Sequence, residues 1–128
     1  MVSSRVGENR CVRVAVILVV LLLAGCGVPQ ELSKQAEEVH SVAAEGALLA
    51  HEASEGSLDT FTREHAKALR KLLGQLQPAI DDDRLARTSD AVDAALADLA
   101  EHPGDRANAS RLERRLGDAA KAADELAG

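Results

Sequence analysis

The chain has 128 residues, a net charge of −6, two cysteines and a single aromatic side chain, that of Phe61. This length suits one domain, and the negative charge argues against nucleic acid as a partner, because phosphate groups require Lys and Arg. The absence of Trp and Tyr leaves almost no ring on which a sugar or a base could stack.

The first 25 residues have the three regions of a secretory signal peptide. Arg5, Arg10 and Arg13 make the start positive, and an apolar run of ten residues follows over 14–23. A helix needs ~20 apolar residues to cross a bilayer, so this shorter run predicts a signal that is cleaved. An uncleaved anchor helix is the alternative interpretation of the same run.

The apolar run ends in Leu23-Ala24-Gly25-Cys26, which resembles the lipobox of bacterial lipoproteins. The resemblance implies cleavage between Gly25 and Cys26 and a thioether-linked diacylglycerol on Cys26. Several buried acyl chains, at ~0.8 kcal/mol per CH2, would then hold the protein on the extracytoplasmic face of the cell membrane. Cleavage removes three arginines and one glutamate, so the remaining 103 residues carry a net charge of −8. Cys26 is then the only cysteine, and no disulfide can form within the chain.

A short tether over residues 26–30 is followed by four predicted amphipathic helices, over 31–54, 58–76, 81–102 and 105–127. Apolar residues at alternating steps of four and three give the first helix a heptad seam. The seam consists of Leu32, Ala36, Val39, Ala43, Gly46, Ala50 and Ala53. The predicted inner stripe of the second helix consists of Leu58, Phe61, His65, Leu69, Leu72 and Leu76.

Turn and cap residues separate these helices. Gly56 fits the C-terminal cap of the first helix, and Ser57 or Asp59 can cap the second. Pro78 ends the second helix, and the acidic stretch 81–83 offers carboxylates to the free N–H groups of the third. Short loops between four helices predict an all-α fold, an antiparallel four-helix bundle over 31–128. Two long hairpins that dimerise are the alternative, because alanine-rich cores are thin.

Charge supports an up-down-up-down order for this bundle. Counted over 31–56, with its C-terminal turn, the first helix carries a net charge of −5, as does the third; the second carries +2 and the fourth is neutral. The two acidic helices are therefore expected on a diagonal, each beside the less acidic pair. The alanine- and arginine-rich composition of this part also resembles that of small actinobacterial lipoproteins of unknown function.

Glu37 and His40 have the Glu-x-x-His spacing that places a carboxylate and an imidazole on one helix face in ferritin-like di-iron bundles. The sequence has no second motif of this kind, and both residues flank the apolar seam instead of lying on it. We therefore expect solvated side chains at these positions and neither a metal nor another cofactor. A metal-handling or ferritin-like protein is the alternative class.

His65 lies in the middle of the predicted inner stripe of the second helix. It would act there as a buried pH-sensitive switch or, more simply, as a core histidine bonded to a carbonyl or a carboxylate.

A spacing of seven residues aligns four acids along one side of the first helix. This acidic row consists of Glu31, Glu38, Glu45 and Glu52. The row could form an electrostatic seam with the long side chains of Lys67 and Lys71 on the second helix. Alternatively, it could receive a basic partner.

The sequence shows neither a glycine-rich phosphate loop nor a nucleophile elbow. It therefore predicts a non-enzymatic, lipid-anchored helical module that acts by contact, as a binding or accessory protein of the bacterial cell envelope. Its expected partners are the membrane, through the lipid on Cys26, and an envelope protein.

Overall fold

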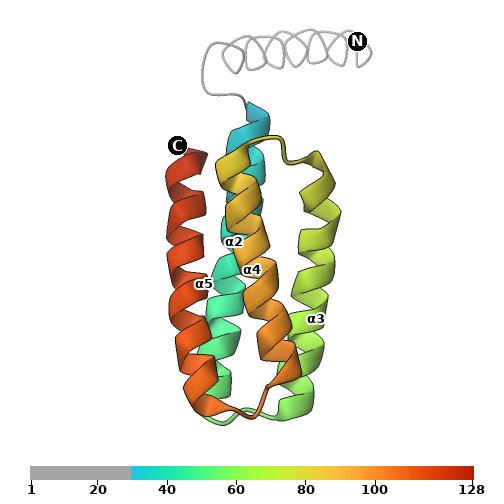
Figure 1. Ribbon diagram of the computed structural model, residues 1–128, viewed down its shortest axis with the longest axis vertical. Coiled ribbons are helices and arrows are strands. Elements are labelled where there is room, and N and C mark those ends of the chain that lie inside the picture. Colours follow the sequence, from blue (N-terminus) through green and yellow to red (C-terminus); the bar gives the residue numbers. More distant parts are fainter. Residues whose placement is uncertain (1–29) are drawn as a thin grey trace, which may run out of the picture. The chain divides into compact units, whose positions relative to one another are not determined.

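The computed structural model describes residues 30–128, which form an antiparallel four-helix bundle without strands, as predicted (Figure 1). The elements are α2 (Gln30–Ser54), α3 (Asp59–Leu76), the short 3-10 helix η1 (Gln77–Ala79), α4 (Asp83–Glu101) and α5 (Arg106–Ala127). The expected signal peptide and the lipidation of Cys26 lie outside the described residues.

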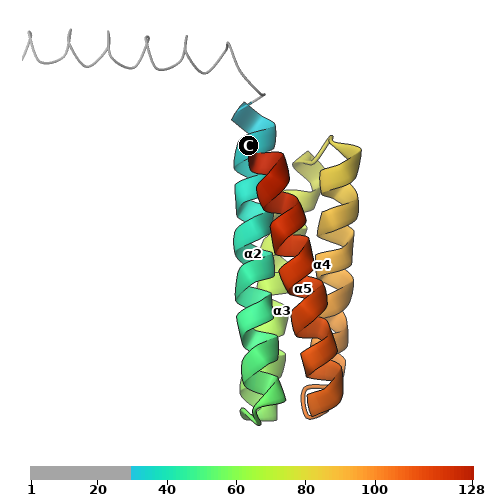
Figure 2. The same ribbon diagram turned by 90° about the vertical axis from the view of Figure 1, so that its left-hand side faces the viewer.

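The helices follow the diagonal arrangement expected from their charges. In two views at right angles, α2 lies opposite α4 and α3 lies opposite α5 (Figures 1 and 2). The last turn of α5 returns to the beginning of α2, where the Ser33 hydroxyl donates to the Ala127 carbonyl at 2.7 Å. The Gln35 amide donates to the Ala79 carbonyl at 2.8 Å at the same end.

The core combines small side chains on α2 with leucines from the other helices. The fully buried α2 residues include Ala36, Ala43 and Ala50. Gly46 lies close to two other helices, because a Cβ atom built on it would be 3.0 Å from Leu96 of α4 and 3.3 Å from Leu116 of α5. Small residues on one helix thus allow the leucines of two others to fill the centre.

Several helix ends have an identifiable cap. Gly56, at φ +98°, takes the left-handed conformation that glycine tolerates. The N–H groups of Gly56 and Ser57 donate to the carbonyls of Ala53 and Glu52, which is a Schellman motif. The Asp82 carboxylate accepts from two backbone N–H groups at 2.9 and 3.0 Å and caps α4.

The N-termini of α5 and α3 differ in how they are capped. The Asp105 carboxylate caps α5 by accepting from the backbone N–H of Asn108 at 3.0 Å. The N-cap of α3 is Leu58, which makes no side-chain capping bond, so the expected capping by Ser57 or Asp59 is wrong.

The predicted inner stripe of α3 is wrong, because most of the buried side chains lie one residue further along the helix than predicted. The side chains that α3 buries are Thr62, Ala66, Leu69 and Leu73. Of the predicted stripe only Leu69 is buried, whereas the exposed members are Leu58, Phe61 and Leu72. The reason is that α3 carries two adjacent apolar stripes, and the one with smaller side chains faces the core.

The close approach at Gly46 gives a test of the packing. Gly117 is an exposed glycine inside α5 with nothing within 4 Å of a built Cβ atom. Gly117→Ala should therefore raise the free energy of unfolding by about 1 kcal/mol, because alanine favours the helix over glycine and meets no obstacle here. The melting temperature should rise by ~4–8 °C. Gly46→Val should instead destabilise the protein by ~1–3 kcal/mol, because its side chain overpacks against Leu96 and Leu116.

Thermal unfolding of the full-length variants, followed by circular dichroism, measures both effects. Gly46→Ala serves as the intermediate case, because its single methyl group requires small shifts of two leucine side chains. We expect it to stabilise the protein less than Gly117→Ala. Equal stabilisation at the two glycines would contradict the close approach of α2 to α4 and α5.

Candidate functional site

A groove of about 160 Å³ lies on the surface between α2 and α3. The residues that line it are Glu45, Leu48, Leu49, Glu52, Phe61 and His65. Leu49 is buried at its base, whereas Leu48 is 60% exposed and Phe61 is 51% exposed. The groove therefore has an apolar floor, partly solvated apolar walls and carboxylates on its α2 side.

The apolar surface continues beyond the groove along α3. Leu58 is 79% exposed and Leu72 is 51% exposed. Positions 61, 65 and 72 follow the helical repeat, so they lie on one face of α3, and Leu58 precedes them as the N-cap residue. Single exposed leucines are common on protein surfaces, whereas large contiguous apolar patches are typical of interaction surfaces. We refer to Leu48, Leu58, Phe61 and Leu72 as the α2–α3 apolar patch.

His65 lies at the edge of the groove and is only partly buried. Its ring packs edge-on against Phe61, with centroids 5.5 Å apart and planes at 86°. The expectation of a buried switch in the core is therefore wrong, because the stripe that contains His65 faces outward. His65 contributes instead to the wall of the groove.

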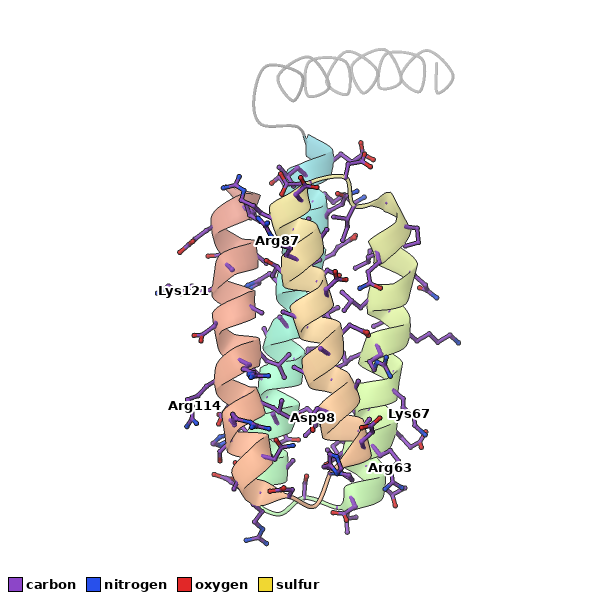
Figure 3. The ribbon with its side chains drawn as sticks, in the orientation of Figure 1. Arg63, Lys67, Arg87, Asp98, Arg114 and Lys121 are labelled. Atoms are coloured by element: carbon purple, nitrogen blue, oxygen red, sulfur yellow. The ribbon has the colours of Figure 1, made fainter. Side chains whose placement is uncertain are left out.

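The acidic row lies as predicted along one side of α2, but the electrostatic seam with α3 is wrong. Glu45 and Glu52 line the groove and are exposed. In the part of the chain that the structure describes, no ion pair includes a member of the row. Lys67, which is labelled in Figure 3, lies instead 3.7 Å from Glu64 of its own helix.

The arginines of α3 are directed towards α4. The Arg70 guanidinium donates to both carboxylate oxygens of Asp93, at 3.0 and 3.3 Å, and these hydrogen bonds raise the pKa of Arg70. A raised pKa keeps Arg70 charged at all ordinary pH values, so this pair loses no stability through Arg70 as the pH rises through neutrality. Arg63 donates to the Ala100 carbonyl at 3.4 Å.

The Glu37 and His40 side chains do not form a metal site with other residues. Nδ1 of His40 lies 2.7 Å from the Ala120 carbonyl of α5, and Glu37 is exposed. A carbonyl oxygen only accepts, so this ring nitrogen carries a proton and is occupied by a helix–helix contact. Within residues 30–128, no group of three or more His, Cys, Asp or Glu side chains could hold a metal ion.

Sequence reasoning missed two features of α2. Leu48 lies off the heptad seam, next to the buried Leu49. His51 also lies off the seam, yet its two ring nitrogens contact Glu55 at 3.1 Å and Glu113 of α5 at 2.8 Å. Both contacts are hydrogen bonds only when the ring carries two protons. The adjacent leucines at 48 and 49 were the sequence signal that could have indicated Leu48. The contact between His51 and Glu113 could not be predicted, because it depends on which helix lies beside α2.

The absence of an ion pair between the acidic row and α3 predicts a difference between two sets of charge variants. Glu38→Gln combined with Glu45→Gln should change the free energy of unfolding by less than about 0.5 kcal/mol. Asp93→Asn should lower it by up to ~1 kcal/mol, because it breaks the partly exposed pair with Arg70. Urea unfolding in low and high salt measures both. A loss in the double variant that salt abolishes would restore the electrostatic seam.

None of the helices in residues 30–128 is long and apolar enough to cross a membrane. No protein-family model, curated protein or solved structure matches this chain. Three features of the chain itself bear on its function. These are the lipobox-like segment, the groove between α2 and α3, and the charges around that groove.

Proposed function

We propose that this protein is a lipid-anchored binding module that acts by contact on the extracytoplasmic face of a bacterial membrane. The observation that carries the binding role is the apolar groove between α2 and α3, where Leu48 and Phe61 are more than half exposed. Keeping such side chains in water opposes the hydrophobic effect. A partner that covers them recovers part of that free energy.

The anchor is supported by the sequence Leu23-Ala24-Gly25-Cys26 behind an apolar run of signal-peptide length. Helix α2 begins at Gln30, only four residues after Cys26. At ~3.5 Å per residue, the intervening chain keeps the beginning of α2 within about 15 Å of the lipid-bearing residue. A bundle on so short a tether stays close to the membrane surface.

The groove lies in the half of the bundle away from this attachment. Glu45 is fifteen residues after Gln30, which corresponds to about 22 Å along the helix at 1.5 Å per residue. On the other side of the groove, Phe61 and His65 lie in the first turns of α3, next to the loop that follows α2. The groove would thus be accessible to envelope proteins while the lipid remains inserted.

The anchor is tested by replacing its acceptor. Cys26→Ala in the full-length protein should abolish incorporation of a fatty-acid label and leave an unprocessed precursor, because only the thiol of Cys26 can take the lipid. Mass spectrometry of the purified protein measures the mass of the N-terminal segment. Normal processing of Cys26→Ala would rule out the lipoprotein assignment, whatever the bundle binds.

The binding role is tested by photocrosslinking in cells that produce the full-length protein. A photoreactive amino acid at Leu48, inside the groove, should form adducts with another protein. The matched control position is Lys121, which projects from the outer side of α5 (Figure 3) and should form none. Adducts of equal yield at both positions, or none at Leu48, would refute a binding role for the groove.

A further inference from the structure

We propose that the groove between α2 and α3 binds an amphipathic helix of another protein whose polar edge carries Lys or Arg. The inference rests on the proposed binding role and specifies the chemistry of the partner. It follows from two independent properties of the groove: the apolar side chains that line it, and the charge on its α2 side.

The apolar side chains suit a third helix laid along two others. Two antiparallel helices form the walls, Leu49 forms the floor, and Phe61 and Leu48 stand at the sides. Leu58 and Leu72 extend the exposed apolar face of α3 in both directions from Phe61 and His65. An apolar face that follows a helical repeat is complementary to a helix with anchors at i, i+3, i+4 and i+7.

The charge next to the groove selects a basic helix. Glu45 and Glu52 line the groove, and neither belongs to an ion pair within residues 30–128. Docking an apolar face beside them removes water from these carboxylates, which is costly unless a cation takes its place. The cations of α3 do not supply it: Arg63 and Arg70 bond to α4, Lys67 lies beside Glu64, and within residues 30–128 Lys71 forms no ion pair with either glutamate. The incoming helix must therefore bring its own.

A second copy of this chain is a poorer occupant. A two-fold interface brings the same surface of each copy together, so Glu45 and Glu52 of both copies would enter one contact. Their combined negative charge opposes that contact. A basic helix from a different protein meets the same carboxylates with attraction.

The experiment uses the full-length protein in phosphatidylcholine nanodiscs, with the photoreactive amino acid at Leu48. The probe is an 18-residue peptide of leucine, alanine and lysine, with leucines at helical spacing and lysines at the polar edge. A matched peptide has glutamate in place of lysine. The yield of peptide adduct at Leu48 is measured as a function of peptide concentration and gives an apparent Kd. Peptide that binds only to lipid forms no adduct at Leu48 and does not contribute to this yield.

We expect a saturable adduct with the lysine peptide and little with the glutamate peptide. Glu45→Gln combined with Glu52→Gln should raise the apparent Kd for the lysine peptide about two- to thirty-fold, and high salt should have a similar effect. The control variant, Asp118→Asn with Asp124→Asn, removes two exposed acids from α5 and should leave the Kd unchanged.

Equal labelling by the two peptides, or an unchanged Kd in the Glu45 and Glu52 variant, overturns the basic partner. A crosslinked homodimer at Leu48 that the lysine peptide does not displace makes a second copy the occupant and also overturns it. If Leu48 forms adducts with another protein in cells but none with the lysine peptide, the binding role holds and the basic helix fails. If Leu48 captures nothing in cells either, both proposals fail.

Discussion

The small size of the side chains on α2 is the constraint on which the rest of the bundle depends. Gly46 lets Leu96 and Leu116 reach the centre from two different helices, and alanines along α2 keep the same spacing above and below it. Protein interiors are packed as densely as organic crystals, so the side chains that α3 adds beside Leu69 and Leu73 must fit the space that remains. Accordingly, α3 presents Thr62 and Ala66 to the core and leaves Phe61 and Leu72 outside.

Most of the fold could be predicted from the sequence, because it depends on local signals. The heptad seam of α2, the glycine at position 56, and the aspartates at 82 and 105 each act within a few residues of the chain. The diagonal arrangement of α2 and α4 also followed from net charge, since neighbouring acidic helices repel. These elements needed no knowledge of which side chains meet across the bundle.

The groove could not be predicted, because it depends on which of two neighbouring stripes α3 turns inward. Hydropathy favours the stripe with Phe61 and Leu72, whereas the core contains Thr62, whose hydroxyl lies 3.0 Å from that of Ser57. The exposure of His65 and the free surface of Glu45 and Glu52 follow from the same rotation of α3. The acidic row was visible in the sequence, but its neighbours were not.

The distribution of polar contacts determines how the bundle would carry a mechanical load. Ser33, His40 and His51 connect α2 to α5, whereas within residues 30–128 no hydrogen bond or ion pair joins helices α2 and α3. A pull on the beginning of α2 would therefore be passed to α5 through these three contacts, and to η1 through the hydrogen bond from Gln35 to Ala79. Among the described residues the seam between α2 and α3 has no such polar link, so under this load it is held by side-chain packing alone.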